Sequence, residues 1–393
     1  MSTASTPATS AQAGSGNDPL QLRDVDYVHF YVGNAKQAAY FYAQSFGFEI
    51  EQVSDLTTGS RDTASYLLTQ GNIRFLISTG LTKNSSIQDE VGLYGDGIKD
   101  IAFTVGDAAA AYEQAIKNGA ESAYEPYEAT DENGTVVRAG IKTMGRVWHT
   151  FVSRTDKYDL DNVKKNRAQF MPGFRSIENL AINRYNQENP VGLFYVDHCV
   201  GNVELGKMNY WVKWYEDVLG FKLFKHFDDK DISTEYSALM SKVMDSGREL
   251  IKIPINEPAE GKRKSQIEEY LDWHNNTPGI QHLALLTKDE LHTVGRLRDR
   301  GVDFLEIPET YYDLVWDRVG EINEDTGSVK DLRVLVDRDD KGYLLQIFTK
   351  PLQDRPTLFF EIICRRGSES FGKGNFKALF ESLELEQERR GNL

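Results

Sequence analysis

The sequence has almost no cysteine, since Cys199 and Cys364 are the only two among 393 residues. Two thiols cannot form the disulfide framework that stabilises many secreted domains. Long hydrophobic runs are also missing, and no stretch approaches the roughly 18 apolar residues of a membrane-spanning helix. The first residues, MSTASTPATSAQAGSGND, lack the charged and then apolar order of a signal peptide and the arginines of a transit peptide. We therefore expect a cytoplasmic protein that makes no membrane contact.

Positive charge is scarce as well. Lysine and arginine number 45 against 60 aspartates and glutamates, which gives a net charge of −15 and a pI near 5.0. Because an acidic surface repels a phosphate backbone, we expect no nucleic-acid partner. Apolar residues make up 40% of the chain and charged residues 27%, which is a globular composition. At roughly 150 residues per domain, this length predicts two or three domains.

The sequence repeats itself. Asp26 lies ten residues before Lys36, and Asp197 lies ten residues before Lys207, with an aromatic stretch of helical pattern after each lysine. Three further pairs of blocks follow in the same order in both halves. They are GIKDIAF with GIQHLAL, KNGAESAYEP with DRGVDFLEIP, and GRVWHTFV with GYLLQIFT. So many matches in one order indicate a duplicated domain.

Both halves show the same succession of strand and helix patterns. Alternating apolar residues predict strands, and apolar residues at helical spacing predict helices. Helices that alternate with groups of strands predict an α+β fold with strongly curved sheets. The predicted strands are 25–33, 64–69, 73–78, 195–203, 235–241 and 249–255, and the predicted helices are 35–46, 107–118, 207–219 and 288–300. The predicted organisation is a disordered leader (1–20), a first half (21–155), an irregular linker (156–192), and a second half (193–393) that ends in a helix over 375–389.

Comparison of the halves isolates three residues. His198 is matched by Tyr27, His282 is matched by Asp100, and Glu361 lies on a strand past residue 352 that has no counterpart in the first half. The flanks of all three are apolar, and a buried, unpaired carboxylate would cost several kcal/mol, so positive charge must lie against Glu361. Two imidazoles and one carboxylate are the facial triad of non-haem Fe(II) oxygenases.

A second interpretation of the same residues stays open. The histidines can be ordinary core residues, with Glu361 paired to an arginine such as Arg365. His149 answers Gln346 in the repeat and is expected to be a hydrogen-bonded strand residue. Cys199 points to the face of its strand opposite to the neighbouring histidine and is not counted as a ligand. The other histidines lack acidic or histidine neighbours at ligand spacing and are expected to be surface or structural residues: His29, His226, His274 and His292.

Glycines punctuate the chain just before the terminal helix. Gly372 and Gly374 look like a phosphate loop, but no GK[ST] follows them, and they do not link a strand to a helix in a βαβ unit. A hinge for a closing helix, comprising Gly372, Gly374 and Asn375, is the better interpretation.

Seven blocks make the second half specific enough to compare with a known family. They are DHCVGNVELGKM from Asp197, PINEP from Pro254, KSQIEEYL from Lys264, GIQHLAL from Gly279, DKGYLLQIFTKP from Asp340, QDRPTLFFEII from Gln353, and SFGKGNFKALFE from Ser370. With these blocks in this order, the chain resembles the 4-hydroxyphenylpyruvate dioxygenases over essentially its whole length.

The resemblance implies a two-domain vicinal-oxygen-chelate fold of paired βαβββ modules. Each half would form an open barrel, the N-terminal one structural and the C-terminal one catalytic. One Fe(II) per subunit would be held by His198, His282 and Glu361. The implied reaction takes 4-hydroxyphenylpyruvate and O₂ to homogentisate and CO₂ in tyrosine and phenylalanine catabolism, through oxidative decarboxylation, ring hydroxylation and side-chain migration. A homodimer or homotetramer is also implied.

The resemblance further implies a substrate pocket. Matching positions that supply hydrogen bonds are Ser241, Asn256, Gln266, Gln281 and Gln346, and those that surround the ring are Phe348, Phe359, Phe376 and Phe380. Neutral amides suit a neutral phenol, because a carboxylate there would have to be desolvated. Phe376 and Phe380 lie four residues apart on one face of the terminal helix, as a lid requires.

Three alternatives remain at this point. Hydroxymandelate synthases share the substrate and the triad, but they tend to carry a smaller side chain where this chain has Phe348. Extradiol catechol dioxygenases share the module and the triad but resemble none of the seven blocks. A non-catalytic binding protein of the same fold would keep the barrel and lose the triad.

Overall fold

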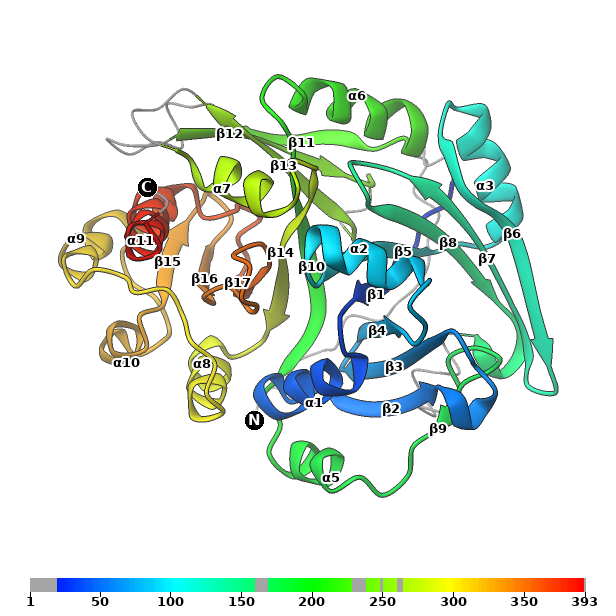
Figure 1. Cartoon of the computed structure of the whole chain (residues 1–393). Coiled ribbons are helices and arrows are strands. Elements are labelled where there is room, and N and C mark those ends of the chain that lie inside the picture. The colour runs from blue at the N-terminus through cyan, green and yellow to red at the C-terminus, as the bar shows by residue number, and fades with distance from the viewer. Residues whose placement is uncertain (1–19, 160–168, 228–237, 248–249, 260–263, 392–393) are drawn as a thin grey trace.

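The sequence repeat corresponds to two curved sheets that lie side by side (Figure 1). The computed structural model describes residues 20–159, 169–227, 238–247, 250–259 and 264–391. The predicted disordered leader therefore lies outside the described residues, apart from Leu20. Within the described part, no helix combines the length and the apolar character that a membrane crossing requires.

The first sheet has the strand order β6-β7-β8-β5-β1-β4-β3-β2-β9, and the second has the order β11-β12-β13-β10-β14-β17-β16-β15. The strands of the first sheet are β1 (Asp24–Tyr31), β2 (Glu49–Ser54), β3 (Thr63–Gln70), β4 (Ile73–Gly80), β5 (Gly97–Thr104), β6 (Glu121–Asp131), β7 (Gly134–Lys142), β8 (Trp148–Arg154) and β9 (Arg175–Ser176). Those of the second are β10 (Leu193–Asn202), β11 (Lys222–Phe227), β12 (Ala238–Asp245), β13 (Lys252–Ala259), β14 (Gly279–Thr287), β15 (Leu335–Arg338), β16 (Tyr343–Phe348) and β17 (Phe359–Arg366).

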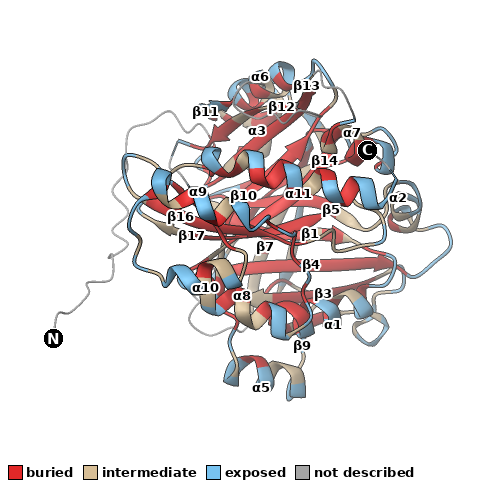
Figure 2. Ribbon diagram, turned by 90° about the vertical axis from the view of Figure 1, so that its left-hand side faces the viewer, coloured by how far each residue is buried: buried red, intermediate tan, exposed pale blue. Residues whose placement is uncertain are grey.

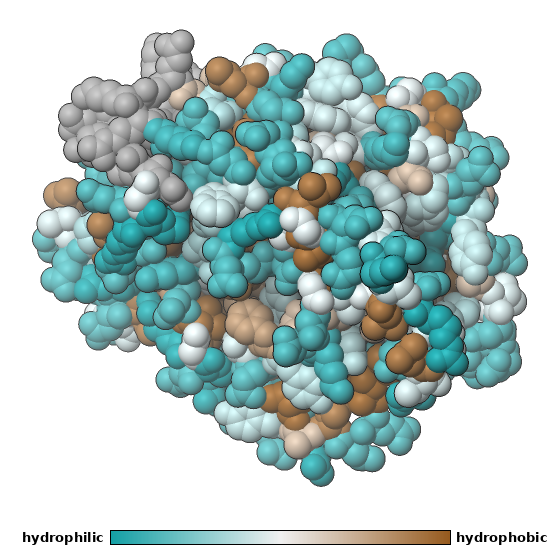
Figure 3. Space-filling model, viewed as in Figure 1, coloured by the Kyte–Doolittle hydropathy of each residue, from teal (hydrophilic) through white to brown (hydrophobic). Residues whose placement is uncertain are grey.

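Helices cover the outer faces of both sheets, and buried residues gather on the strands and on the inward sides of the helices (Figure 2). On the face drawn in Figure 3, hydrophilic residues predominate and hydrophobic ones occur in small groups. The α-helices are α1 (Ala35–Phe46), α2 (Ser86–Tyr94), α3 (Ala108–Lys117), α5 (Ala181–Glu188), α6 (Met208–Leu219), α7 (Gln266–Trp273), α8 (Glu290–Asp299), α9 (Thr310–Val319), α10 (Thr326–Asp331) and α11 (Phe376–Arg389).

Equivalent helices end in the same way in both halves. The predicted helices are confirmed as α1, α3, α6 and α8, and the terminal helix as α11. Gly47 and Gly220 end α1 and α6 with φ of +78° and +70°, a left-handed conformation that costs glycine little. The described parts of the expected strands at 235–241 and 249–255 lie mostly in β12 and β13, which continue to Asp245 and Ala259, while residues 235–237 and 249 lie outside the described residues.

The linker was expected to be irregular, and this expectation is wrong. The segment contains α5 and the short strand β9, which extends the first sheet by pairing with β2. Asn186 on α5 donates hydrogen bonds to the carbonyl oxygens of Ala43 (3.0 Å) and Phe48 (2.8 Å). Polar side chains that bond backbone groups have no hydrophobic period, so sequence patterning did not reveal this helix.

The topology also corrects the expected correspondence between the halves. β8 pairs in parallel with β5, and β17 pairs in parallel with β14, so the strand of Glu361 is the counterpart of β8 and not an addition. Asp100 lies opposite Trp148, and His282 lies opposite Phe359, which makes Thr150 the counterpart of Glu361. By the same registers His149 answers Phe360 and not Gln346. Hydrogen bonding between neighbouring strands determines which residues correspond in the two halves. The apolar sequence of a buried strand does not show with which strand, or in which register, it pairs.

The outer face of β17 is anchored in the first half. Phe360 packs among the rings of Tyr42, Phe46 and Phe75, with ring centroids 5.9, 5.1 and 5.8 Å away. Because successive side chains on a strand point to opposite faces, this contact directs Glu361 into the second barrel. The first half thus fixes the strand that carries the carboxylate.

Candidate active site

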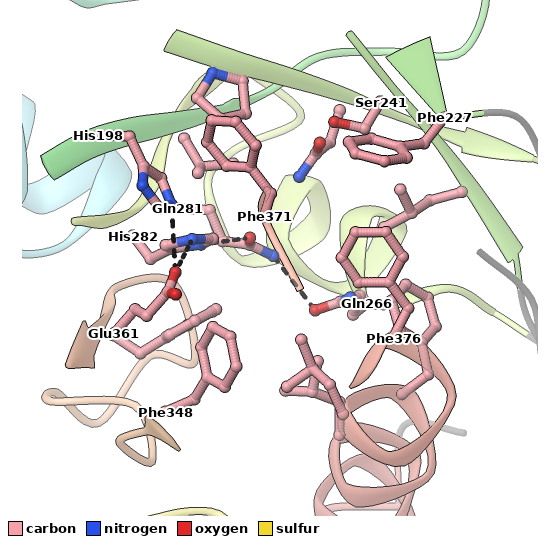
Figure 4. Close-up of a pocket in the computed structure, with 18 of the residues that line it drawn as sticks. His198, Phe227, Ser241, Gln266, Gln281, His282, Phe348, Glu361, Phe371 and Phe376 are labelled. Atoms are coloured by element: carbon pink, nitrogen blue, oxygen red, sulfur yellow. Dashed lines mark hydrogen bonds and ion pairs between the residues drawn. The ribbon is translucent and has the colours of Figure 1, made fainter. Parts of the chain in front are cut away.

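The three residues isolated by the repeat lie on three adjacent strands, β10, β14 and β17. His198 and Glu361 are both directly opposite Ala284 of β14, and His282 lies two residues before that alanine. Residues two apart on a strand share a face, so the pairing register places the three side chains together inside the barrel. Figure 4 shows them converging at one end of a pocket.

Their geometry fits a single metal ion. Nε2 of His198 is 3.1 Å from Oε2 of Glu361, and Nε2 of His282 is 3.5 Å from the same oxygen. All three ligand atoms lie within 4.8 Å of one another. Ligands at right angles around a metal, with bonds of about 2.1 Å, are about 3.0 Å apart. Among the described residues this is the one group of histidine, cysteine and acidic side chains with such spacing, and facial coordination leaves positions open for other ligands.

Each imidazole is oriented by an acceptor on its other nitrogen. Nδ1 of His198 is 2.8 Å from Oδ2 of Asp197, and Nδ1 of His282 is 3.1 Å from Oε1 of Gln281. With the proton on Nδ1 in both rings, the Nε2 lone pairs face Glu361 and are free for a metal. Figure 4 shows the contact between His282 and Gln281.

The arginine that the alternative interpretation pairs with Glu361 binds a different carboxylate. Arg365 binds Asp197 with two hydrogen bonds, from Nε to Oδ1 (2.8 Å) and from Nη2 to Oδ2 (2.6 Å). Glu361 instead faces the two imidazoles. The alternative of a Glu361–Arg365 pair is therefore wrong, and positive charge from a metal is left as the natural complement of the carboxylate.

Electrostatics favour an ionised carboxylate. Burial opposes ionisation of Glu361, but His198 and His282 outweigh this effect and lower its pKa. Burial also opposes protonation of His198, yet Glu361 and Asp197 raise its pKa. Burial raises the pKa of Asp197, and Arg365 more than reverses this, so the pKa lies below its ordinary value. The cluster thus presents negative charge to a cation.

A mostly apolar cavity of about 70 Å³ adjoins the three residues. The ring of Phe359 stacks on His282 with centroids 4.8 Å apart, and the ring of Phe348 meets His282 edge-on at 6.1 Å. Eight of the nine expected substrate-binding residues line the cavity: Ser241, Asn256, Gln266, Gln281, Phe348, Phe359, Phe376 and Phe380. α11 closes one side of it (Figure 4).

Amide and hydroxyl groups gather on the side of the cavity away from Glu361. Nε2 of Gln281 donates to Oε1 of Gln266 at 3.3 Å, and Ser241 lies directly opposite Asn256 in the β12–β13 pair. The two glutamines thus extend a hydrogen-bonded chain from His282 toward α7. Such groups can bind a neutral hydroxyl without a buried charge.

Gln346 lies outside the cavity lining. Its side chain is buried, and neither polar atom of its amide has a hydrogen-bond partner among the described residues. It lies against Gly372, where a β-carbon would collide with that amide, and where φ is +74°. Its expected contact with a substrate stays a prediction.

The predicted hinge is closely packed in this structure. A β-carbon on Gly374 would collide with Arg318 and Asp337. Oδ1 of Asn375 accepts hydrogen bonds from Oη of Tyr311 (2.7 Å) and Nη2 of Arg318 (3.1 Å). These glycines thus let the backbone approach neighbouring side chains closely, and their role as a hinge stays a prediction.

Sequence reasoning missed most of the apolar lining: Val200, Phe227, Leu239, Val243, Pro254, Phe371, Leu379 and Leu383. Leu379 and Leu383 could have been found, since they share the face of α11 that carries Phe376 and Phe380. Residues on different strands carry no such signal, because the pairing that brings them together is not visible in the sequence.

The corresponding place in the first half is filled by its own side chains. Oη of Tyr124 is 2.8 Å from Oγ1 of Thr150, and Thr150 donates its backbone N–H to Asp100 at 3.0 Å. By the pairing registers, Gly140 is the counterpart of Phe348. The ring of Tyr124 lies against Gly140, in the space that a side chain at this position would take. As expected, His149 on β8 is hydrogen-bonded, with Nδ1 3.0 Å from the carbonyl oxygen of Ile101 and Nε2 2.8 Å from Oη of Tyr215.

The comparisons with known proteins agree with this architecture. The model of the glyoxalase/bleomycin resistance protein/dioxygenase superfamily matches residues 24–148 and 195–347, one match in each half. Among solved structures, a triple mutant of 4-hydroxymandelate synthase from Streptomyces coelicolor is similar, with a TM-score of 0.80 and 28% identity. That similarity covers 93% of this chain and 99% of the synthase.

Curated relatives match more closely in sequence. The 4-hydroxyphenylpyruvate dioxygenase of Tetrahymena thermophila is 46% identical, over 94% of this chain and 91% of the relative. That of Dictyostelium discoideum is 45% identical over 95% of this chain and 100% of the relative, and that of Caenorhabditis elegans is 44% identical over 94% and 93%. Matches of this length include the strand of Glu361, which lies beyond the superfamily match.

Proposed function

Because the chain belongs to the 4-hydroxyphenylpyruvate dioxygenase family of the glyoxalase/dioxygenase superfamily, we propose that it converts 4-hydroxyphenylpyruvate and O₂ to homogentisate and CO₂ in tyrosine catabolism. The observation that carries this proposal is the buried set of two histidines and one glutamate at metal-binding distances beside an aromatic cavity. Oxygen chemistry on a 2-oxo acid requires this combination of a metal with open positions and a dry pocket.

We propose one Fe(II) per subunit, bound by Nε2 of His198, Nε2 of His282 and the carboxylate of Glu361. When bound, Fe(II) supplies the electron transfer to O₂ that side chains cannot provide, and it offers positions for a bidentate 2-oxo acid. The protein orients the ligands, since Asp197 and Gln281 hold the two imidazoles in the metal-binding tautomer.

The aromatic side chains would hold the ring of the substrate and exclude water. Phe348 and Phe359 lie beside His282, and Phe376 and Phe380 contribute from α11. A ring enclosed in this way is aimed at the metal, and reactive species are kept from solvent.

The polar side chains of the pocket would bind the ends of the substrate. Gln266, Gln281, Asn256 and Ser241 offer hydrogen bonds to its phenol, and we propose that Gln346 contributes to the same network. Its unpartnered amide supports this role, because a buried amide without partners is costly unless a ligand or water satisfies it.

The terminal helix would have to move for substrate entry. The cavity has about 70 Å³ of space, whereas a cavity of about 150 Å³ is known to hold a benzene ring. We therefore propose that α11 opens as a lid, with Gly372, Gly374 and Asn375 as its hinge. The present structure would be the closed form.

The alternative activity, hydroxymandelate synthesis, has weaker support. The synthase structure is 28% identical to this chain, whereas the dioxygenases are 42–46% identical over comparable lengths. Phe348 also occupies the position where the synthases tend to have a smaller side chain.

We also propose that the enzyme is a cytoplasmic homodimer or homotetramer. Both cysteines are free and buried, which suits a reducing compartment. The even subunit number rests on the family alone.

Oxygen uptake by protein reconstituted anaerobically with Fe(II) tests the proposed reaction. We expect uptake on addition of 4-hydroxyphenylpyruvate, with homogentisate identified by mass and retention time. Formation of 4-hydroxymandelate would replace the proposed reaction by the alternative, and absence of uptake by iron-loaded protein would contradict both.

A further inference from the structure

One arginine touches both the metal site and the base of the terminal helix. Two nitrogens of Arg365 bind the carboxylate of Asp197, whose other contact is Nδ1 of His198. The third nitrogen, Nη1, donates to the carbonyl oxygens of Ser370 (2.6 Å) and Ser368 (3.3 Å). These carbonyls belong to the turn that leads from β17 to α11, residues 367–375.

A second contact follows the same route. The ring of Phe371, in that turn, meets the ring of His198 edge-on with centroids 5.0 Å apart. The guanidinium of Arg365 lies over the same ring, 5.5 Å from its centroid. Phe371 also lines the cavity. The turn therefore contacts a metal-binding imidazole directly as well as through Asp197.

We propose that Arg365 is a positioning residue that couples metal binding at His198 to the order of the turn 367–375, and hence to closure of α11. The proposal rests on the proposed function for the metal at that imidazole. A bound metal would fix the His198 ring, the fixed ring would hold Asp197 in its two-point contact, and Asp197 would hold the guanidinium against the turn.

The chemistry of the guanidinium suits this role. Its donors lie in one rigid plane, so an arginine that is held by a carboxylate on one edge presents its remaining donors in a fixed direction. Its side chain is 15% exposed, and that of Asp197 is 5% exposed, so water competes weakly for these bonds. A lysine could match the charge but has no second edge to offer.

Another carboxylate holds the turn from the opposite side. Oδ2 of Asp339 accepts hydrogen bonds from the backbone N–H groups of Glu369 (2.9 Å) and Ser370 (3.0 Å) and from Oγ of Ser368 (2.8 Å). If these bonds alone ordered the turn, its exchange behaviour would not depend on Arg365 or on the metal. The two possibilities are therefore separable by experiment.

The test is hydrogen exchange of the backbone amides of residues 367–376, measured by mass spectrometry with and without Co(II). In the wild-type protein we expect Co(II) to slow this exchange by about tenfold or more, since exchange reports local opening. In Arg365→Lys, which keeps positive charge beside Asp197, we expect Co(II) still to bind, with its affinity lowered by about 10- to 100-fold. With Co(II) at saturation, the slowing of exchange in the turn of this variant should be much smaller than in the wild-type protein, because only the contact between Phe371 and His198 then remains.

The neighbouring arginine provides a matched control. Arg366 follows on the same strand but binds Glu324 (2.8 Å) and the carbonyl oxygen of Lys288 (3.0 Å), away from the turn. Arg366→Lys should keep the metal-dependent slowing. The Asp339→Asn variant weakens the hydrogen bonds that Asp339 accepts from the turn. In this variant the effect of Co(II) on the exchange rate of the turn should be larger than in the wild-type protein.

Two results would overturn the coupling: Arg365→Lys with the same Co(II)-dependent slowing as wild type, or a wild-type protein that binds Co(II) with no change in the turn. Neither readout needs turnover. A protein with intact coupling that fails to convert 4-hydroxyphenylpyruvate would count against the proposed function alone. Failure of the wild-type protein to bind Co(II) would overturn the metal assignment and the coupling together.

Discussion

Replacement of Glu361 by glutamine is the most informative single change in the site. The variant Glu361→Gln keeps the shape and volume of the side chain and removes one negative charge from a group that is 3% exposed. In the wild-type structure one oxygen of this carboxylate, Oε2, lies 3.1 Å from Nε2 of His198 and 3.5 Å from Nε2 of His282. An incoming metal would then meet two neutral imidazoles and a neutral amide.

The magnitude follows from the burial of the pair. Removal of one partner from a buried charge pair costs about 3–5 kcal/mol. At about 1.4 kcal/mol per tenfold, this corresponds to a rise of roughly 10²- to 10⁴-fold in the dissociation constant for Fe(II). Turnover should be lost at ordinary iron concentrations.

The assay is anaerobic titration with Fe(II), with bound metal measured after gel filtration. A second buried glutamate gives the control, because Glu290 on α8 is 1% exposed and burial raises its pKa well above the ordinary value. Glu290→Gln therefore exchanges one neutral group for another and should bind Fe(II) as wild type does. Wild-type affinity and stoichiometry in Glu361→Gln would refute the assignment of that carboxylate as a ligand.

Three further predictions concern the surroundings of the site. Burial raises the pKa of Asp100 from 3.8 to about 7, so the folded protein favours the protonated, neutral carboxyl group. The free energy of unfolding should therefore fall as pH rises from about 4 to about 7, where the unfolded chain loses this proton more readily than the folded one. Asp100→Asn should therefore gain stability over wild type by up to about 4 kcal/mol at pH 8 relative to pH 4, and parallel curves of thermal midpoint against pH would contradict this. Gly372→Ala should lower the thermal midpoint more than Gly206→Ala does, since both glycines have a positive φ (+74° and +78°) but only the first meets neighbouring atoms; equal midpoints would mean that the turn adapts. Gln281→Leu removes the acceptor 3.1 Å from Nδ1 of His282 and should weaken Fe(II) binding by about 10- to 100-fold, whereas unchanged affinity would show that this acceptor does not orient the ring.

The candidate metal site could be predicted from the sequence because the duplication supplied an internal comparison. The contrast of His198 with Tyr27 and of His282 with Asp100 separated the proposed metal ligands from ordinary strand residues. Helices with a clear apolar period were predicted within one or two residues of their observed ends, as for α1 and α11. The apolar period of a helix lies within one continuous segment, so the order of the residues is enough to show it.

Features that depend on pairing across the sheet could not be predicted in this way. Glu361 was assigned to an additional strand, whereas the register makes Thr150 its counterpart. The alternative interpretation paired Arg365 with Glu361, whereas two hydrogen bonds hold Arg365 on Asp197 of the neighbouring part of the sheet. Both errors have one physical origin: contacts between distant strands are set by hydrogen-bond register, which leaves no period in the sequence.

The placement of Gln346 shows the same limit at the level of a side chain. Matching to a family assigns the residue to the pocket, whereas in the structure its amide lies against Gly372 and outside the cavity lining. Under the proposed lid motion of α11, the position of this amide relative to the cavity would change. A sequence motif does not contain that information.

We propose that this chain transfers both atoms of O₂ to one substrate at the site of His198, His282 and Glu361. The most direct measurement is the mass spectrum of the product that the Fe(II)-loaded enzyme forms from 4-hydroxyphenylpyruvate under ¹⁸O₂. We predict homogentisate with two labelled oxygens, one in the new ring hydroxyl and one in the carboxylate, together with release of unlabelled CO₂. Unlabelled homogentisate, or a product whose new hydroxyl is on the benzylic carbon, would contradict the account.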